Sequence, residues 1–248
     1  MPDLSLIPHL SAFQWLLGAV CAFMVGVAKT GVPGVGILAI PLMVLAVGDA
    51  RQSAGWLLPV LCTADVFAVF YWRRHAAAGR LFSLLPWVVA GMALGAAALS
   101  LNERILRPGV GFIVLLMLGA YLRRRLRPDT ASRPAHPAPY GVSAGFATTV
   151  ANAAGPVMNL YLLSKNLPKE EFVATGAWFF FIVNLAKVPI YIWHGLFSAK
   201  SLAFDVLMVP AVLAGALTGR WVVNRISPAV FETSVVALTA ISTLLLFR

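Results

Sequence analysis

Ten apolar segments follow one another along nearly the whole chain, and the short loops between them hold most of the charge. A helix needs about 20 apolar residues to cross a bilayer, and several stretches of that kind exclude a soluble fold. Only 11% of the residues are charged, against about 25% in a soluble domain. The segments cover residues 12–28, 35–47, 54–72, 81–100, 108–122, 138–150, 153–164, 172–193, 202–223 and 228–247.

The fold class that follows is an all-α polytopic membrane protein. Some segments are too short to cross alone, so we expect two helical hairpins, over residues 12–48 and 138–164, which either cross fully or re-enter. About eight transmembrane helices accompany these two hairpins. The formal net charge of +10 lies mainly in loops, where basic residues set topology. The expected partner is therefore the lipid bilayer, and no nucleic acid is expected.

Both hairpins contain a stretch that is interrupted by Gly and Pro. The first stretch is residues 28–41, AKTGVPGVGILAIP, and the second is residues 148–159, TTVANAAGPVMN. Backbone groups that such breaks leave without hydrogen bonds are costly in lipid, so irregular backbone persists only against protein or a cavity. Paired broken segments in corresponding halves typically mark the central site of a transporter. We expect the substrate site at these breaks.

The two halves of the chain repeat weakly. Several matching positions recur in the same order, which indicates an internal repeat. We expect an N-terminal repeat over residues 1–122, a basic cytoplasmic linker over residues 123–137 and a C-terminal repeat over residues 138–248. An offset of 119 residues pairs Gly26 with Gly145, Gly36 with Gly155, Asp65 with Asn184 and His75 with His194, and an offset of 120 pairs Gly95 with Gly215 and Pro108 with Pro228.

The distribution of basic residues predicts the orientation of these repeats. With the linker in the cytoplasm, the alternating loops place twelve Lys and Arg inside and five outside. This bias agrees with the positive-inside rule. The corresponding loops 73–80 and 194–201 then lie on opposite faces of the membrane, so we expect the two repeats to be inverted.

Lys29 is the charged residue at the first break. A charge at membrane depth costs at least ~2.5–3.5 kcal/mol and usually faces the protein interior or a water-filled cavity. An ammonium, a hydroxyl and the open N–H groups of a restarting helix together suit a small anion. Alternatively, Lys29 extends to an interface and the glycines only permit close packing. The other predicted substrate contacts here are Thr30, Gly31, Pro33, Gly34 and Gly36.

The second break carries neutral polar groups. Under inverted symmetry its tip would face the first break near the midplane and complete one site. Alternatively, these groups only satisfy the broken backbone. The predicted contacts are Thr149, Asn152, Gly155, Pro156 and Asn159.

Three more polar residues lie inside apolar segments. Asn184 and Lys187 are three residues apart, which places them on one face of a helix, and we include both among the substrate contacts. Asp65 is the candidate for proton coupling, because buried carboxylates can exchange protons. A purely structural Asp65–Lys187 pair is the alternative. Asp205 lies near a helix end, where an interface role is expected.

The residues of the two breaks resemble those of the TauE/SafE family, also called sulfite exporter-like or toluenesulfonate uptake permeases. The resemblance rests on KTGVPGVG from Lys29 and on NAAGP from Asn152, and it covers essentially the whole chain. The second motif departs from the commoner family form, a Gly-Gly-rich run followed by Pro-x-Leu. The resemblance implies transport of sulfur-containing or organic anions across the bacterial inner membrane. The family includes both exporters and importers.

The resulting hypothesis is a secondary transporter, with export as the expected direction, for a small sulfur-containing anion such as sulfite or an organosulfonate. It would work by alternating access at a site between two inverted repeats. No nucleotide-binding, metal-ligand or catalytic motif is evident, so neither an enzyme nor a cofactor is expected. A transporter of an unrelated solute and an accessory membrane subunit are the alternatives, and homo-oligomerisation is left open.

Overall fold

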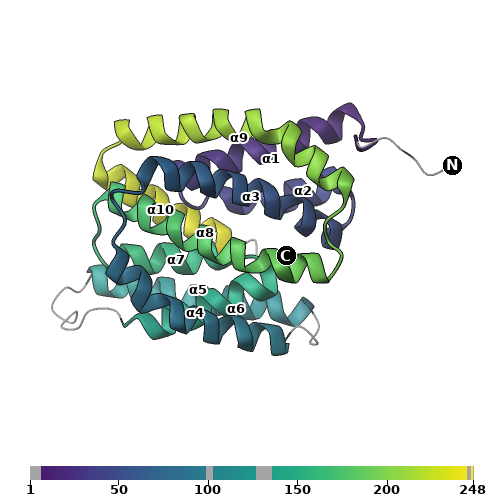
Figure 1. Ribbon diagram of the computed structural model, residues 1–248. Coiled ribbons are helices and arrows are strands. Elements are labelled where there is room, and N and C mark those ends of the chain that lie inside the picture. The colour runs from purple at the N-terminus through teal and green to yellow at the C-terminus, as the bar shows by residue number, and fades with distance from the viewer. Residues whose placement is uncertain (1–6, 99–102, 127–135, 245–246, 248) are drawn as a thin grey trace. The chain divides into compact units, whose positions relative to one another are not determined.

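The computed structural model describes residues 7–98, 103–126, 136–244 and 247, and within these ranges the chain is helical and without strands. Most of the predicted linker 123–137 lies outside the described residues. Each of the ten predicted segments corresponds to one helix, so the all-α prediction is confirmed. The helices are α1 Ala12–Thr30, α2 Ala39–Val47 preceded by the short 3-10 helix η1 Val35–Leu38, α3 Ala50–Trp72, α4 Ala78–Ala98, α5 Glu103–Leu126, α6 Pro137–Ala151, α7 Ala154–Leu163, α8 Lys169–Trp193, α9 Ala199–Arg225 and α10 Pro228–Leu244 (Figure 1).

Five of the described helices are long and apolar enough to cross a membrane, namely α1, α3, α4, α8 and α9. Shorter apolar helices of 10–17 residues occur at 108–123 within α5, in α7 and in α10. Many large apolar side chains on these helices are exposed, as lipid-facing residues are. The fold is therefore that of a multi-pass membrane protein.

Local sequence fixes the starts of the helices that carry the buried polar residues. Ser11 and Gln14 form a reciprocal capping box at the start of α1. Asp49 accepts a hydrogen bond from the N–H of Gln52 at the start of α3, and Ser198 with Ser201 forms a second box at the start of α9. Such caps satisfy N–H groups that a helix leaves unbonded. They set where each long helix begins, and hence the depth of its side chains.

Both predicted breaks are present. After α1 ends, Gly34 has a φ of 108°, a conformation that only glycine adopts without strain, and the chain resumes with η1. After α6 ends, Asn152 has a left-handed φ of 52°, which asparagine tolerates better than most residues, and α7 begins two residues later. The interruptions therefore arise from backbone conformations that these particular residues permit.

The chain divides into two compact units, residues 1–75 with 177–226 and residues 76–176 with 227–248. The first unit contains α1, η1, α2, α3, α9 and the later part of α8. The second contains α4, α5, α6, α7, α10 and the beginning of α8. Each unit draws helices from both predicted repeats, and the repeats themselves stay a prediction.

Within each unit, two helices approach closely at glycines. In the first unit, a Cβ on Gly26 of α1 would overlap the backbone of α9 at Val212. In the second unit, a Cβ on Gly145 of α6 would overlap the backbone of α4 at Val88. Small residues allow this approach between membrane helices. The pairs α1 with α9 and α4 with α6 are each side by side in Figure 1.

The two pairs pack in matching ways. The contact of Gly215 with Phe23 in the first pair corresponds to that of Gly91 with Val142 in the second. In this correspondence each residue of α6 is numbered 119 higher than its counterpart in α1. Each residue of α9 is numbered 124 higher than its counterpart in α4.

The same offsets relate Gly219, which contacts Thr30, to Gly95, which contacts Thr149. The threonines also match, because Thr30 donates to the carbonyl of Gly26 at 3.0 Å and Thr149 to that of Gly145 at 2.9 Å. By these contacts Gly95 corresponds to Gly219. The sequence offset of 120 pairs Gly95 instead with Gly215, which lies one helical turn before Gly219.

Candidate functional site

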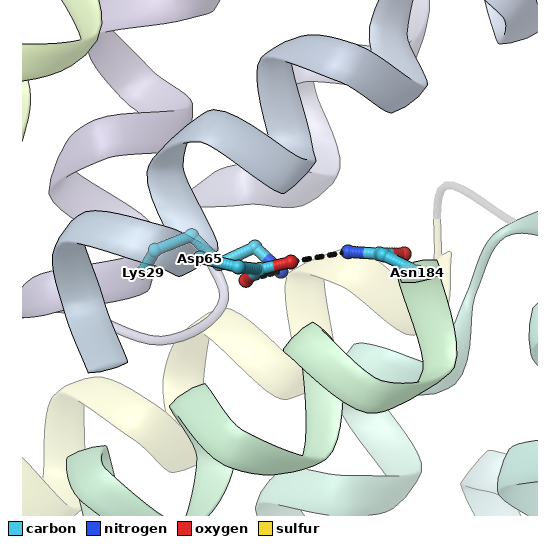
Figure 2. A network of polar contacts seen from close by, with 3 residues as sticks. All are labelled: Lys29, Asp65 and Asn184. Carbon is cyan, nitrogen blue, oxygen red and sulfur yellow. Dashed lines mark hydrogen bonds and ion pairs between the residues drawn. The ribbon is translucent and has the colours of Figure 1, made fainter. Parts of the chain in front are cut away.

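Three helices of the first unit bring a buried cluster of polar side chains together (Figure 2). The last turn of α1 supplies Lys29, the middle of α3 supplies Asp65, and α8 supplies Asn184. The Nζ of Lys29 lies 2.7 Å from Oδ1 of Asp65, and Nδ2 of Asn184 donates to Oδ2 of the same carboxylate at 2.6 Å. Asp65 is fully buried and Asn184 is 3% exposed. The two carboxylate oxygens are thus held by different partners.

Lys187 joins this cluster from the same face of α8. It is 5% exposed and close enough to interact electrostatically with both Lys29 and Asp65. The structure pairs Lys29 with Asp65. Two lysines and one carboxylate therefore lie within electrostatic range of one another. Positive charge in such a buried region would stabilise an anion.

The side chain of Lys29 turns inward. It is 10% exposed, and its Nζ lies 4.1 Å from the centroid of the Phe180 ring, a cation–π contact. Phe180 is one helical turn before Asn184 on α8, so the face of α8 that carries the polar residues also carries this ring. Phe180 was not predicted as a site residue, although its spacing of four residues from Asn184 places both on one face of α8.

Thr30 holds α1 against α9. Its hydroxyl faces the carbonyls of Gly26 at 3.0 Å and Ala216 at 2.7 Å, and its own carbonyl accepts from Nε1 of Trp72 at 3.1 Å. A hydroxyl has one proton to donate, and here that proton is directed to backbone carbonyls. In this conformation Thr30 positions the end of α1, and with it Lys29.

The rest of the first break surrounds the end of α1. Gly31 is buried and packs directly on the backbone of Gly219 in α9, where no larger residue fits. Pro33, Gly34 and Gly36 are half-buried in the turn and in η1. Helix α2 then begins without a side-chain cap, so its first N–H groups have no side-chain acceptor at the cap position.

The second break lies in the second unit. Thr149 bonds within α6, and Asn159 of α7 is 2% exposed and donates to Oγ1 of Thr239 at 3.3 Å. Pro156 is buried, and a Cβ on Gly155 would meet nothing within 4 Å. Together with Asn152, these residues form a neutral polar group at the start of α7, which also begins without a side-chain cap.

Asp205, for which an interface role was expected, is covered by protein. It is 7% exposed, and neither of its carboxylate oxygens has a hydrogen-bond partner among the described residues. It lies in the second turn of α9, whose neighbours on α1 and α3 bury it. The sequence placed it near a helix end correctly, but the end of this helix is covered by protein.

No group of three or more His, Cys, Asp or Glu that could hold a metal ion occurs in the part of the chain that the structure describes. Comparison with protein families matches residues 17–246 to the family described as sulfite exporter TauE/SafE. No curated protein and no solved structure matches the chain. The match covers nearly all of the chain and confirms the resemblance drawn from the two breaks.

Proposed function

Because the chain belongs to the sulfite exporter TauE/SafE family, a family of membrane transporters, we propose that it is a secondary transporter that exports a small sulfur-containing anion, such as sulfite or an organosulfonate, across the bacterial inner membrane. The observation that carries this proposal is the buried cluster in which Lys29 pairs with Asp65 and Lys187 lies within electrostatic range of both.

The cluster suggests how an anion would bind. While Asp65 is ionised, it occupies the ammonium of Lys29 and competes with any anion. When Asp65 takes up a proton, it loses its charge, and Lys29 becomes available to a sulfonate or sulfite oxygen. The net charge of the cluster is then the same before and after binding, because one proton enters with one negative charge. Anion binding and proton binding are thus coupled.

This coupling makes the direction of flux depend on the gradients of both the anion and the proton. If the anion and the proton move together, transport is electroneutral and runs down the product of their two gradients. A cell that produces the anion inside would drive its export by this route. Asp65 would be the coupling residue, and Asn184 would keep the carboxylate in place during the exchange.

The remaining predicted contacts have supporting roles. Thr30 and the glycines of the first break would set the position of Lys29. Thr149, Asn152, Gly155, Pro156 and Asn159 would offer neutral donors to the substrate from the start of α7, where N–H groups without a side-chain cap favour negative charge. This part of the proposal rests on the chemistry of those groups.

Alternating access between two inverted repeats is part of the same proposal. The matching glycine contacts of the pairs α1–α9 and α6–α4 support an internal repeat. Asp65 and Asn184 occupy equivalent positions at the offset of 119 and bond directly to each other. Equivalent residues meet only close to the axis that relates two repeats. The cluster would then lie near that axis, where a transporter fold of this kind binds its substrate.

The test is flux through proteoliposomes that contain only this protein, with methanesulfonate, sulfite, sulfate and chloride as substrates. Methanesulfonate stays ionised throughout the accessible pH range, so its flux reports the protonation of the protein. We expect saturable flux of a sulfur anion that rises as the pH falls. Absence of flux for all four anions would contradict the proposal and favour an unrelated solute or an accessory role.

The Lys29→Ala variant locates the site. Removal of the ammonium should reduce sulfur-anion flux at least tenfold, while the protein still inserts and elutes as a single species. Lys169→Ala is the matched control, because it removes a lysine that lies at the start of α8, outside the cluster. Unchanged flux in Lys29→Ala would remove Lys29 from the site.

A further inference from the structure

Asp205 is a buried carboxylate that the proposed binding site does not use. It is 7% exposed, and both of its oxygens lack hydrogen-bond partners among the described residues. Asp65, the other carboxylate buried in this unit, is held by Lys29 and Asn184. The negative charge of Asp65 is therefore balanced by a lysine and an amide. The carboxylate of Asp205 has no such partner among the described residues.

The surroundings of Asp205 are largely apolar. The neighbouring Phe204 stacks against Trp15 of α1 and tilts against Trp56 of α3, with ring centroids 5.4 and 5.1 Å apart. Met208, one turn further along α9, belongs to the same core. Ser201, one turn earlier, directs its hydroxyl to the carbonyl of Ser198. These residues give the carboxylate no hydrogen bond.

The titratable groups on the surrounding helices of this unit are few. On α1 they are Lys29, which is paired with Asp65, and Cys21, which is buried. On α3 they are Asp65, Cys62, Arg51 and Tyr71, and on α8 the nearest to the cluster is Lys187. The helix of Asp205 itself, α9, also carries Lys200, Arg220 and Arg225. Cys62 interacts electrostatically with both Asp205 and Asp65.

A buried carboxylate in this situation must be neutralised. An unpaired ion costs many kcal/mol to remove from water, so the group holds a proton or a cation. A hard cation such as Ca²⁺ or Mg²⁺ needs about six oxygen ligands, which an aromatic and aliphatic environment does not supply. A proton needs only the carboxylate itself.

We propose that Asp205 is a second proton-binding site, which exchanges its proton with Asp65 during the transport cycle. The proton passes from Asp205 to Asp65 through intervening water, so that an O–H bond breaks at Asp205 as one forms at Asp65. Asp205 then takes up a proton from solution, which ends its brief ionised state. This inference rests on the proposed function, since it supplies the proton that frees Lys29 for the anion. The coupling proton would then reach the cluster from the start of α9, where Asp205 lies.

The experiment separates two modes of transport in proteoliposomes that contain the full chain. Net efflux of methanesulfonate requires the proton to be released and taken up again in each cycle. Exchange of labelled for unlabelled methanesulfonate across the membrane does not. A pH-sensitive dye inside the vesicles reports the proton that accompanies net efflux.

In Asp205→Asn we expect net efflux and its proton signal to fall at least tenfold, while exchange stays within twofold of the wild type. Retained exchange also shows that the variant is folded. Asp205→Glu should recover part of the net efflux, because it restores a titratable group. Glu170→Gln, which alters a carboxylate at the start of α8 outside the cluster, should behave as the wild type. Net efflux with an unchanged proton signal in Asp205→Asn would overturn the proposal and leave the transporter intact.

An infrared measurement keeps the inference testable if no anion is transported. The wild-type protein at neutral pH should show the C=O stretch of a protonated carboxyl group. This band should be missing in Asp205→Asn and shifted in Asp205→Glu. A wild-type spectrum without such a band would refute a proton on Asp205, whatever the transport assays give.

Discussion

At the scale of single residues, the decisive feature is that one carboxylate lies within electrostatic range of two lysines. The sequence pointed to Lys29, Asp65, Asn184 and Lys187 because each is polar in an apolar segment. It could not tell that Lys29 pairs with Asp65, because that depends on how α1 and α3 are placed. It also could not show that Asp205 is buried, because distance from a helix end says nothing about what covers that end.

Asp65→Asn tests the competition between the carboxylate and the substrate. The variant removes the internal anion but keeps a side chain of nearly the same shape beside Asn184. We expect exchange of methanesulfonate across the membrane in Asp65→Asn to lose its dependence on pH and to remain high at neutral pH. Two buried ammonium groups would then lack a counter-ion, so the variant should also be less stable without substrate.

Thermal unfolding measures the second effect. Methanesulfonate should raise the Tm of Asp65→Asn more than that of the wild type, because ligand that binds only the folded state stabilises it. Glu170→Gln serves as the control for loss of a carboxylate elsewhere. If Asp65→Asn keeps the pH dependence of the wild-type flux, Asp65 is not the coupling group.

At the scale of helices, the apolar segments predicted every described helix, because length and hydropathy alone limit where a membrane helix can lie. The ends agree less closely, since Ser11 and Asp49 cap helices at positions that hydropathy does not reveal. The register of the repeat was the harder problem. A shift of four residues returns a helix to nearly the same face, so sequence matching could not distinguish Gly215 from Gly219 as the counterpart of Gly95.

The close helix pairs give a prediction about stability. Gly26→Ala and Gly145→Ala should each lower the Tm, because the added methyl group would overlap the backbone of the facing helix. Gly119→Ala is the matched control, since a Cβ there meets nothing within 4 Å and alanine favours a helix by about 1 kcal/mol over glycine. Unfolding in detergent, followed by circular dichroism, measures all three. Equal Tm values for Gly26→Ala and the wild type would contradict the close approach of α1 to α9.

At the scale of the whole molecule, the compact units and the predicted repeats divide the chain differently. Each unit combines helices from both halves, because α1 packs on α9 and α6 packs on α4. A sequence comparison detects only which segments resemble each other, and it does not show which of them pack together. The division into two repeats therefore stays a prediction, and the composition of the compact units could not be predicted from the sequence.

Inversion of the repeats is tested by labelling. Single cysteines at positions 75 and 198, introduced into a variant in which Cys21 and Cys62 are replaced, should react with a membrane-impermeant maleimide from opposite sides of the membrane. His75 lies in the loop after α3, and Ser198 lies in the loop before α9. Labelling of both positions from the same side would exclude the inverted arrangement.

The bond between Asn184 and Asp65 has a consequence for how such a chain could arise. If the two repeats descend from one duplicated gene, the ancestral protein was a symmetric dimer in which this position met its own copy. Two aspartates there would repel each other or share a proton, and two asparagines would leave the buried lysines without a counter-ion. Only after fusion could one copy keep the acid while the other acquired the amide. A homodimer, whose two copies are identical, could not have formed this pair of one aspartate and one asparagine.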